Sequence, residues 1–352
     1  VGLMQLTTNY GKRCSAVEAF LKPIKNNKNL KIVLKTIVTK IIFEGDKAIG
    51  VETLNKGKIN KYFANNEIIL TAGAYISPKI LMLSGVGDEN ELSKHNIKTI
   101  CNLKGVGKNL QDHHEVPFVA ETKSGYGYFK QDKGIRMLIN GLQYMLFNSG
   151  PVTSNAAETC SFLNPRDLSD NKEPPIKLYC VQIMYTDRDT KDINPTHGLT
   201  LTSCIMNPKA RGEVTLKSSN PLDRPLINPN FFSNEDDLNL LMDSVKFART
   251  VIDTNPLKEI VIKEVLPGTK INTDNELRDY CKRTVKTNWH PVGTCKMGLE
   301  TDKFAVLDSK LRVHGLKNLR VFDVSMMPSL VSANTNAPAM AIADRATDMM
   351  LN

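Results

Sequence analysis

A histidine set among glycines late in the chain is the first feature that could do chemistry. His290 lies within Asn288–Gly298, with Trp289 directly before it and Gly293 shortly after it. Removing a hydroxyl proton needs a base that is uncharged near neutral pH, and imidazole meets that requirement. Glycines let the backbone approach a flat ligand closely. The segment therefore predicts either a general base beside a planar cofactor or a structural histidine in a glycine-rich loop.

A second candidate is Asn334, which directly precedes an expected apolar helix. Thr335 and Asn336 are suited to cap that helix, and Pro338 suits its first turn, where N–H groups lack helical partners. The helix N-terminus stabilises negative charge, and the Asn334 amide can donate to a substrate oxygen. The patch therefore predicts an anion-stabilising site, a capped core helix, or both.

A third stretch predicts a strand, a glycine turn and a helix. Glu67–Leu70 has the composition of a buried strand, and Ala72 and Gly73 follow it as a turn. Ser77–Pro78 is expected to open the helix, and Gly85–Gly87 to close it. In doubly wound sheets, ligands bind at the carboxyl end of such a strand. We therefore expect the turn to contact a cofactor.

Hydrophobic patterns elsewhere predict an α/β chain. Short β-branched runs predict strands at 30–34, 37–43 and 48–52. Alternating patterns predict a half-exposed antiparallel sheet at 176–185, 199–206 and 213–217. Helical spacing predicts helices at 234–255, 276–283 and 338–351. The chain is thus expected to combine part of a doubly wound domain with an antiparallel-sheet domain.

Composition favours a globular protein with a basic surface. The 352 residues are 41% hydrophobic and 24% charged, with a formal net charge of +9. Lysines alternate with apolar residues around 22–40 and 56–61, and aromatic residues make up only 6%. A solvated lysine-rich surface is favoured over a nucleic-acid face, which groups its basic residues with stacking aromatics. No apolar run has the length of a membrane helix.

Several other site classes lack support in the sequence. The seven cysteines include no Cys-x-x-Cys pair, which argues against a zinc module. Neighbouring side chains in Asp112–Glu115 diverge, whereas a metal needs three or four converging ligands. The chain has neither the Gly-x-Ser-x-Gly elbow of serine hydrolases nor the Gly-x-Gly-x-x-Gly fingerprint of dinucleotide sites.

In their order along the chain, these motifs resemble the glucose–methanol–choline (GMC) oxidoreductases, flavoenzymes that oxidise alcohols by hydride transfer to FAD. The most specific matches are 71–87, 288–298 and 319–340. The residue matching His290 is the family's proposed catalytic base, and the residue matching Asn334 hydrogen-bonds the substrate oxygen. The lysine- and asparagine-rich composition is similar to that of the insect glucose dehydrogenase-like branch. That similarity implies an alcohol or sugar substrate and a quinone or oxygen as electron acceptor.

The resemblance also implies FAD contacts and a domain plan. The implied contacts are Val38, Ala72, Gly73, Asn109, Asp112, Trp289, Asp323, Thr335, Asn336 and Pro338. A mild departure is Val324, where the family usually has a small residue. The resemblance implies an incomplete FAD domain from 1–115 and 286–352 and a substrate domain from 116–285. Because the fingerprint is lacking, we expect the C-terminal part of a longer enzyme, inactive alone. A catalytically inactive descendant kept for binding or structure is the alternative.

Overall fold

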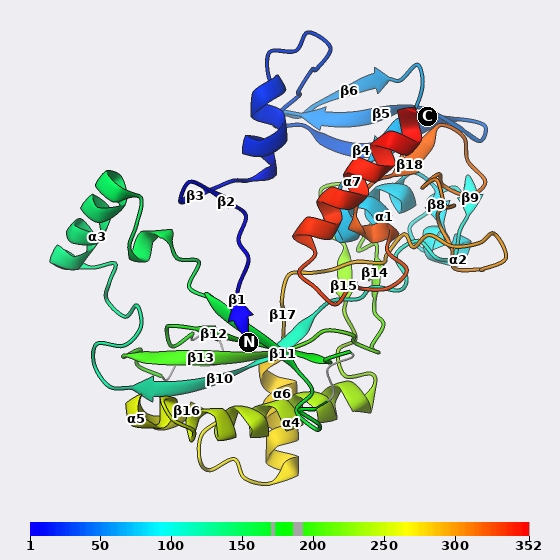
Figure 1. The fold of residues 1–352 in the computed structure, drawn as a ribbon. Helices are drawn as coiled ribbons and strands as arrows, with labels where there is room; N and C mark the ends of the chain where they lie inside the picture. Colours follow the sequence, from blue (N-terminus) through cyan, green and yellow to red (C-terminus); the bar gives the residue numbers. More distant parts are fainter. Residues whose placement is uncertain (170–172, 186–192, 352) are drawn as a thin grey trace. The chain divides into compact units, whose positions relative to one another are not determined.

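The computed structural model describes residues 1–169, 173–185 and 193–351, and the chain divides into two compact units (Figure 1). Unit 1 consists of Val1–Ile32, His114–Ile205 and Glu235–Lys286. Unit 2 consists of Val33–His113, Met206–Asn234 and Thr287–Asn352. The predicted mixed α/β fold with antiparallel sheets is confirmed.

Unit 1 is built on an antiparallel sheet. Among the described residues the sheet has seven strands, in the order β1-β11-β12-β13-β10-β16, with β17 paired to β10 beside that path. The strands are β1 (Gly2–Leu3), β10 (His114–Thr122), β11 (Thr159–Leu163), β12 (Ile176–Val181), β13 (Gly198–Ile205), β16 (Val261–Leu266) and β17 (Lys286–Thr287).

Strand β13 is buried along its whole length, so the prediction of a half-exposed sheet is wrong there. The chain after β12 covers part of it, because the Thr200 hydroxyl donates to the Ile183 carbonyl at 2.8 Å and accepts from the Tyr185 backbone N–H at 2.8 Å. The same contacts take 183–185 out of the sheet. Strand β12 therefore ends at Val181 instead of the predicted residue 185.

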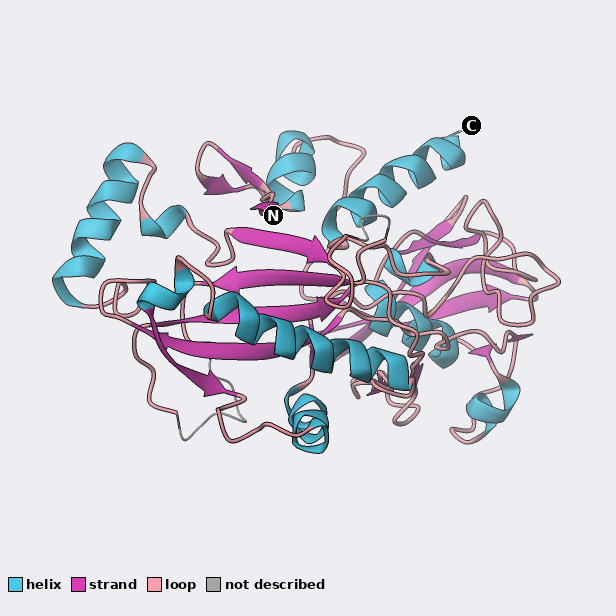
Figure 2. Cartoon of the chain, turned by 60° about the horizontal axis from the view of Figure 1, so that its bottom comes forward, coloured by secondary structure: helices cyan, strands magenta, loops and turns pink. Residues whose placement is uncertain are grey.

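Helix α4 (Glu235–Ile252) lies across this sheet and packs on β10 and β13 (Figures 1 and 2). Its buried apolar side chains keep the helical spacing seen in the sequence: Leu238, Leu241, Val245, Ala248 and Ile252. Helix α6 (Asp274–Thr284) packs on α4. It begins before the predicted residue 276, because Thr273 and Glu276 form a reciprocal capping box.

The remaining elements of unit 1 are short or lie at its surface. They are β2 (Thr8–Asn9), β3 (Lys12–Arg13), η1 (Val17–Leu21), η2 (Lys22–Ile24), α3 (Gly134–Phe147), η3 (Pro151–Thr153) and α5 (Leu257–Ile260). Helix α3 was not predicted, although Ile135, Leu138 and Leu142 recur at helical spacing, and none of its residues is buried. Across the described ranges, no helix combines the length and apolar character needed to span a bilayer.

Unit 2 contains four small sheets within the described part of the chain. β4 (Ile37–Glu44), β5 (Lys47–Asn55) and β6 (Lys58–Phe63) are antiparallel; β7 (Ile68–Leu70) pairs in parallel with β18 (Leu319–Val321); β8 (Val86–Gly87) pairs in parallel with β9 (Cys101–Asn102); β14 (Glu213–Thr215) pairs with β15 (Leu226–Asn228).

Two strand predictions, at 30–34 and 213–217, are wrong in whole or in part, and the six-residue strand β6 was not predicted. Residues 30–34 form no strand, and most of them are exposed. The strand expected at 213–217 does not join the large sheet of unit 1, because it pairs with β15 instead. β6 was not predicted, since its residues are exposed throughout and its lysine-rich sequence shows no alternation.

The helices of unit 2 are α1 (Gly73–Leu83), α2 (Glu89–Ser93), η5 (Val324–Met326) and α7 (Asn336–Leu351). Helix α1 begins at Gly73, so the prediction that Ser77–Pro78 opens it is wrong. The Ser77 hydroxyl instead lies inside the helix and accepts a hydrogen bond from the Ala72 backbone N–H at 3.1 Å. It thus satisfies a backbone donor at the start of the helix.

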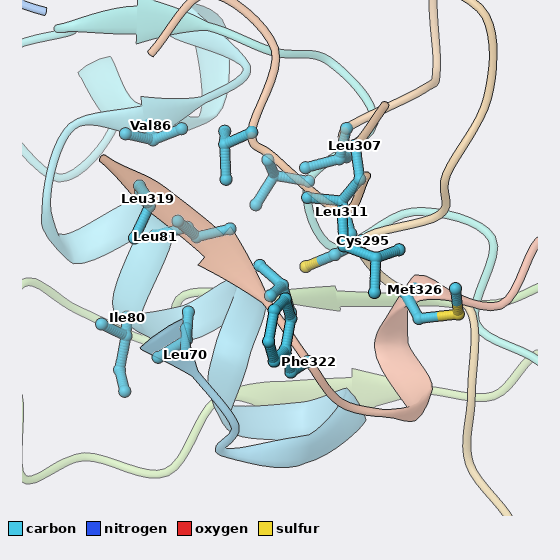
Figure 3. Close-up of a cluster of buried hydrophobic side chains, with 14 of the residues drawn as sticks. Leu70, Ile80, Leu81, Val86, Cys295, Leu307, Leu311, Leu319, Phe322 and Met326 are labelled. Carbon is cyan, nitrogen blue, oxygen red and sulfur yellow. The ribbon is translucent and has the colours of Figure 1, made fainter. Parts of the chain in front are cut away.

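The core of unit 2 joins α1, β18 and the segment that follows His290 (Figure 3). Leu81 of α1, Val321 of β18 and Cys295 are fully buried in one cluster. Leu307 contributes from a loop and Met326 from η5. The histidine-bearing segment is therefore anchored in the same core as the predicted strand–turn–helix.

Candidate active site

The turn between β7 and α1 is held by a carboxylate from the end of β18. β7 and β18 pair in parallel, with Leu70 opposite Val321, so their carboxyl ends meet at one edge. There one oxygen of Asp323 accepts from the Gly73 backbone N–H at 3.0 Å and from the Ser77 hydroxyl at 2.6 Å. The structure thus brings together three predicted site residues, Ala72, Gly73 and Asp323, at the edge where doubly wound sheets bind ligands.

Pro78 explains how α1 is tied to the segment after His290. A proline inside a helix offers no N–H to the carbonyl four residues earlier, which here belongs to Ala74. The Thr294 hydroxyl donates to that carbonyl at 2.6 Å. Thr294 is fully buried, so this bond satisfies two polar groups that water does not reach. The glycine-rich segment is therefore fixed against α1.

Asn109 and Gln111 brace the same segment from another loop. The Asn109 amide donates to the Gly293 carbonyl at 3.1 Å, and the Gln111 amide donates to the Pro328 carbonyl at 3.1 Å. The Gln111 side-chain oxygen accepts from the Leu330 backbone N–H at 3.1 Å. Asn109, implied by resemblance to contact FAD, is seen here holding backbone carbonyls.

Asp112 positions the backbone of His290. One carboxylate oxygen accepts from the His290 backbone N–H at 3.0 Å, and the other accepts from the Thr287 hydroxyl. Thr287 in turn accepts from the Trp289 backbone N–H at 2.8 Å. Tyr75 lies within the electrostatic reach of Asp112: burial and that negative charge raise the pKa of Tyr75 to about 12, so its hydroxyl stays protonated.

His113 contacts the ring of His290. The two Nδ1 atoms are 2.9 Å apart and the rings meet edge to face at 90°. His113 is fully buried, and its Nε2 lies 3.1 Å from the Met206 carbonyl oxygen. The sequence argues against a metal site in the run that contains His113, and the resemblance implies a cofactor contact for Asp112 but no role for His113 itself. Within the described residues, no group of three or more His, Cys, Asp or Glu side chains could hold a metal ion.

The other predicted site residues lie in unit 2, and all of them except the buried Thr335 are exposed or partly exposed. Trp289 is 82% exposed and has a positive φ of 64°. Asn334 is exposed, and the Thr335 carbonyl accepts from the Ala339 backbone N–H at 2.9 Å, which places Thr335 at the start of α7. Val38 lies in β4, partly buried against the core. Every residue that the sequence assigned to the site therefore falls in unit 2.

Proteins that match the chain along nearly its whole length identify its family. Two family models described as GMC oxidoreductase match residues 1–115 and 208–343. The chain belongs to the GMC oxidoreductase family. A Pseudomonas putida alcohol dehydrogenase [acceptor] is 36% identical over 100% of this chain and 63% of that protein. Mitochondrial choline dehydrogenase from Mus musculus is 35% identical over 99% of this chain and 58% of that protein. The chain thus spans about three fifths of these relatives' length.

Solved GMC structures share the fold. A formate oxidase from Aspergillus oryzae, whose structure concerns FAD modification, has a TM-score of 0.87 at 29% identity, covering 98% of this chain and 64% of that one. Pyridoxine 4-oxidase from Mesorbium loti has a TM-score of 0.84 at 26% identity, covering 98% and 63%. GMC oxidoreductases are FAD flavoproteins. The resemblance at family level is therefore confirmed, whereas the insect glucose dehydrogenase-like subtype stays a prediction.

The exposed residues of unit 2 fit a flavin chemically. No atom lies within 4 Å of a Cβ built on Gly73, so the turn faces open space there. The first turn of α7 carries Asn336 and Pro338, and its backbone N–H groups suit the negative charge of a reduced pyrimidine ring. The Trp289 indole offers an exposed aromatic face nearby in sequence to the candidate base.

Proposed function

We propose that the chain forms part of an FAD-dependent oxidoreductase that converts an alcohol to a carbonyl compound. His290 takes the hydroxyl proton, and the Asn334 amide donates a hydrogen bond to the same oxygen. Bound FAD would accept the hydride from the carbinol carbon. The observation that carries the proposal is the support of His290, whose backbone N–H bonds Asp112 at 3.0 Å and whose ring meets His113 at 2.9 Å.

The residues divide the work as follows. Asp112 and His113 keep the imidazole in place before the alcohol arrives, which lowers the cost of reaching the reactive geometry. His290 must be neutral to accept a proton, and once protonated it stabilises the developing carbonyl compound electrostatically. We assign the surface at Val38, Ala72 and the start of α7 to FAD binding. Unit 2 then corresponds to the flavin domain and unit 1 to the substrate domain.

The substrate class rests on the relatives. Their names include an alcohol dehydrogenase [acceptor], a mitochondrial choline dehydrogenase and an oxygen-dependent choline dehydrogenase. We therefore propose a small alcohol as substrate. A sugar is the narrower option, suggested by the lysine- and asparagine-rich composition that resembles the insect branch of the family. Either a quinone or oxygen serves as acceptor. Reoxidation of the reduced flavin, compared in air and under nitrogen with benzoquinone, separates these two acceptors.

The test is His290→Ala in the FAD-loaded protein. Losing a general base should lower the rate of alcohol-dependent flavin reduction by about 10²–10⁴ while FAD remains bound. Stopped-flow absorbance measures the rate, and the flavin spectrum measures the bound FAD. His197→Ala is the matched control, because His197 is only partly buried and lies in unit 1, whereas every proposed site residue lies in unit 2. A His290→Ala rate within a few-fold of wild type would remove His290 from the mechanism and favour a binding or structural role.

A further inference from the structure

His113 joins two groups whose hydrogen-bonding roles can be worked out. Its Nε2 lies 3.1 Å from the Met206 carbonyl oxygen, and its Nδ1 lies 2.9 Å from Nδ1 of His290. A carbonyl oxygen only accepts hydrogen bonds, so the proton of His113 must be on Nε2. In a neutral imidazole the other nitrogen then carries a lone pair.

That assignment determines the proton of His290. Because Nδ1 of His113 carries a lone pair, the 2.9 Å contact requires Nδ1 of His290 to be the donor. A neutral His290 with its proton on Nδ1 has its lone pair on Nε2. The opposite arrangement would need both nitrogens of His113 protonated, and His113 is fully buried, where an imidazolium loses its solvation.

We infer that His113 is a positioning residue that fixes His290 in the Nδ1–H tautomer and leaves Nε2 as the proton-accepting atom. The use of that atom in catalysis rests on the proposed function, whereas the tautomer itself does not. His113 does for His290 what a carboxylate does for the histidine of a serine protease, but without a formal charge. When Nε2 takes a proton, Nδ1–H of the imidazolium donates a stronger bond to His113.

The backbone of the same region keeps this pair in register. The Asn288 backbone N–H donates to the His113 carbonyl at 2.7 Å. Gln111 and Val292 exchange backbone hydrogen bonds at 3.1 and 2.9 Å. Together with the bond from the His290 N–H to Asp112, these contacts fix both main chains beside the two rings. The two rings are therefore carried by segments whose main chains are paired with each other.

The direct test is the protonation pattern of the imidazoles in the 352-residue chain. With ¹⁵N-labelled histidine, long-range ¹H–¹⁵N correlations distinguish a protonated nitrogen from one with a lone pair in each of the six histidines. His314 is an internal reference, because its Nε2 lies 3.1 Å from the Gly298 carbonyl oxygen and so also carries the proton. We expect the Nε2–H form for His113 and His314 and the Nδ1–H form for His290. An Nε2–H form for His290, or a cation at His113, overturns the inference.

Two variants test the causal step. In His113→Asn, the carboxamide oxygen stands in for Nδ1 as an acceptor, so His290 should keep its Nδ1–H form. In His113→Leu, the acceptor at position 113 is lost, and His290 should show a mixture of tautomers. Far-UV circular dichroism checks folding, and if the leucine variant does not fold, the wild-type and asparagine spectra still decide. A pure Nδ1–H form in folded His113→Leu contradicts the assigned role.

The flavin-loaded protein gives a separate readout. Partners that orient a functional imidazole typically contribute about 10–100-fold. We expect His113→Leu to slow flavin reduction by about that factor, and His113→Asn to restore most of the rate. If His290→Ala leaves the rate unchanged while the spectra show the Nδ1–H form, the proposed function fails and the tautomer assignment stands.

Discussion

His290 owes its position to two residues that lie far from it in the sequence. Asp112 accepts from its backbone N–H at 3.0 Å, and the His113 ring meets its imidazole at 2.9 Å. One support thus acts on the main chain and the other on the side chain. The dipeptide Asp112-His113 therefore determines both the backbone position of His290 and the tautomer of its ring.

The sequence could predict His290 but not its partner. An imidazole among glycines has a recognisable chemistry, and the resemblance to GMC enzymes points to the same residue. His113 lies in a run whose diverging side chains argue against a metal site, and the resemblance implies a cofactor contact there for Asp112 but not for His113. Its partner is 177 positions away, and no local periodicity encodes such a contact. The signal that could have found it is the Asp-His pair itself, read as support for a second histidine.

Asn334 can be tested for its two predicted roles at once. We expect Asn334→Ala to slow alcohol-dependent flavin reduction by about 10–10³-fold, because it removes a donor to the reacting oxygen. Stopped-flow absorbance measures the rate. Thr335→Ala is the matched control, because Thr335 occupies the start of α7 and the change weakens that end by about 1 kcal/mol without touching the Asn334 amide.

The two roles of Asn334 give opposite patterns. A slow but stable Asn334→Ala protein that retains FAD supports the donor role. If Asn334→Ala instead loses FAD and melts at a lower temperature, as Thr335→Ala should, Asn334 acts mainly through the helix start.

At the level of elements, the strand–turn–helix of β7 and α1 was predictable, but the start of the helix was not. A buried strand, a glycine turn and an apolar helix follow directly from Glu67–Leu83. The helix begins earlier than expected because Asp323, which follows β18, accepts from the Gly73 N–H, while Ser77 accepts from Ala72. The cap thus comes from a segment that is distant in the sequence, and local rules placed it wrongly at Ser77–Pro78.

Gly293 lies where the segment that contains His290 contacts Asn109. We expect its substitution to lower the free energy of unfolding. Its φ is +91°, and a Cβ there would lie 2.6 Å from the Asn109 carbonyl oxygen. Gly57 provides a matched control in the same unit, since its φ is +78° and nothing lies within 4 Å of its Cβ position. We expect Gly57→Ala to cost about 1–2 kcal/mol from backbone strain alone. Gly293→Ala should cost about 1–3 kcal/mol more, because Asn109 must move.

Urea unfolding followed by circular dichroism measures both variants. In the FAD-loaded protein, Gly293→Ala should also slow flavin reduction, because Asn109 and Gly293 lie in the two segments that hold His290. Gly57→Ala should not change that rate. Equal losses of stability in the two variants would show that the Asn109 contact yields easily and does not position the base.

At the level of the whole molecule, the sequence indicated two kinds of architecture but not how the chain alternates between them. The predicted boundaries at 115 and 286 lie close to two of the changes between units, at 113–114 and 286–287. The units differ from the predicted domains by grouping 1–32 with unit 1 and 206–234 with unit 2. The second of these segments contains β14, whose short alternating pattern also suits the larger sheet. Pattern alone cannot choose between two available sheet partners.

The last prediction concerns FAD binding by the 352-residue chain alone, which we expect to be weak. Dinucleotides bind across a Gly-x-Gly-x-x-Gly turn whose helix N-terminus holds the pyrophosphate, and the sequence has no such turn. The glycine pairs that come nearest are used for packing. A Cβ on Gly85, Gly105 or Gly107 would lie 2.4, 2.1 or 2.2 Å from a backbone carbonyl oxygen. These turns are therefore closed by protein and cannot cradle a phosphate.

Gel filtration after incubation with excess FAD tests this expectation. Circular dichroism should show that the eluted chain is folded. The absorbance of the released flavin should correspond to well below one FAD per chain. If the open reading frame extends upstream of Val1, the added residues should include a strand, the glycine fingerprint and an acidic residue for the ribose, and the longer protein should retain FAD. One tightly held FAD on the 352-residue chain would show that Val38, the Gly73 turn and the start of α7 bind the cofactor without that motif.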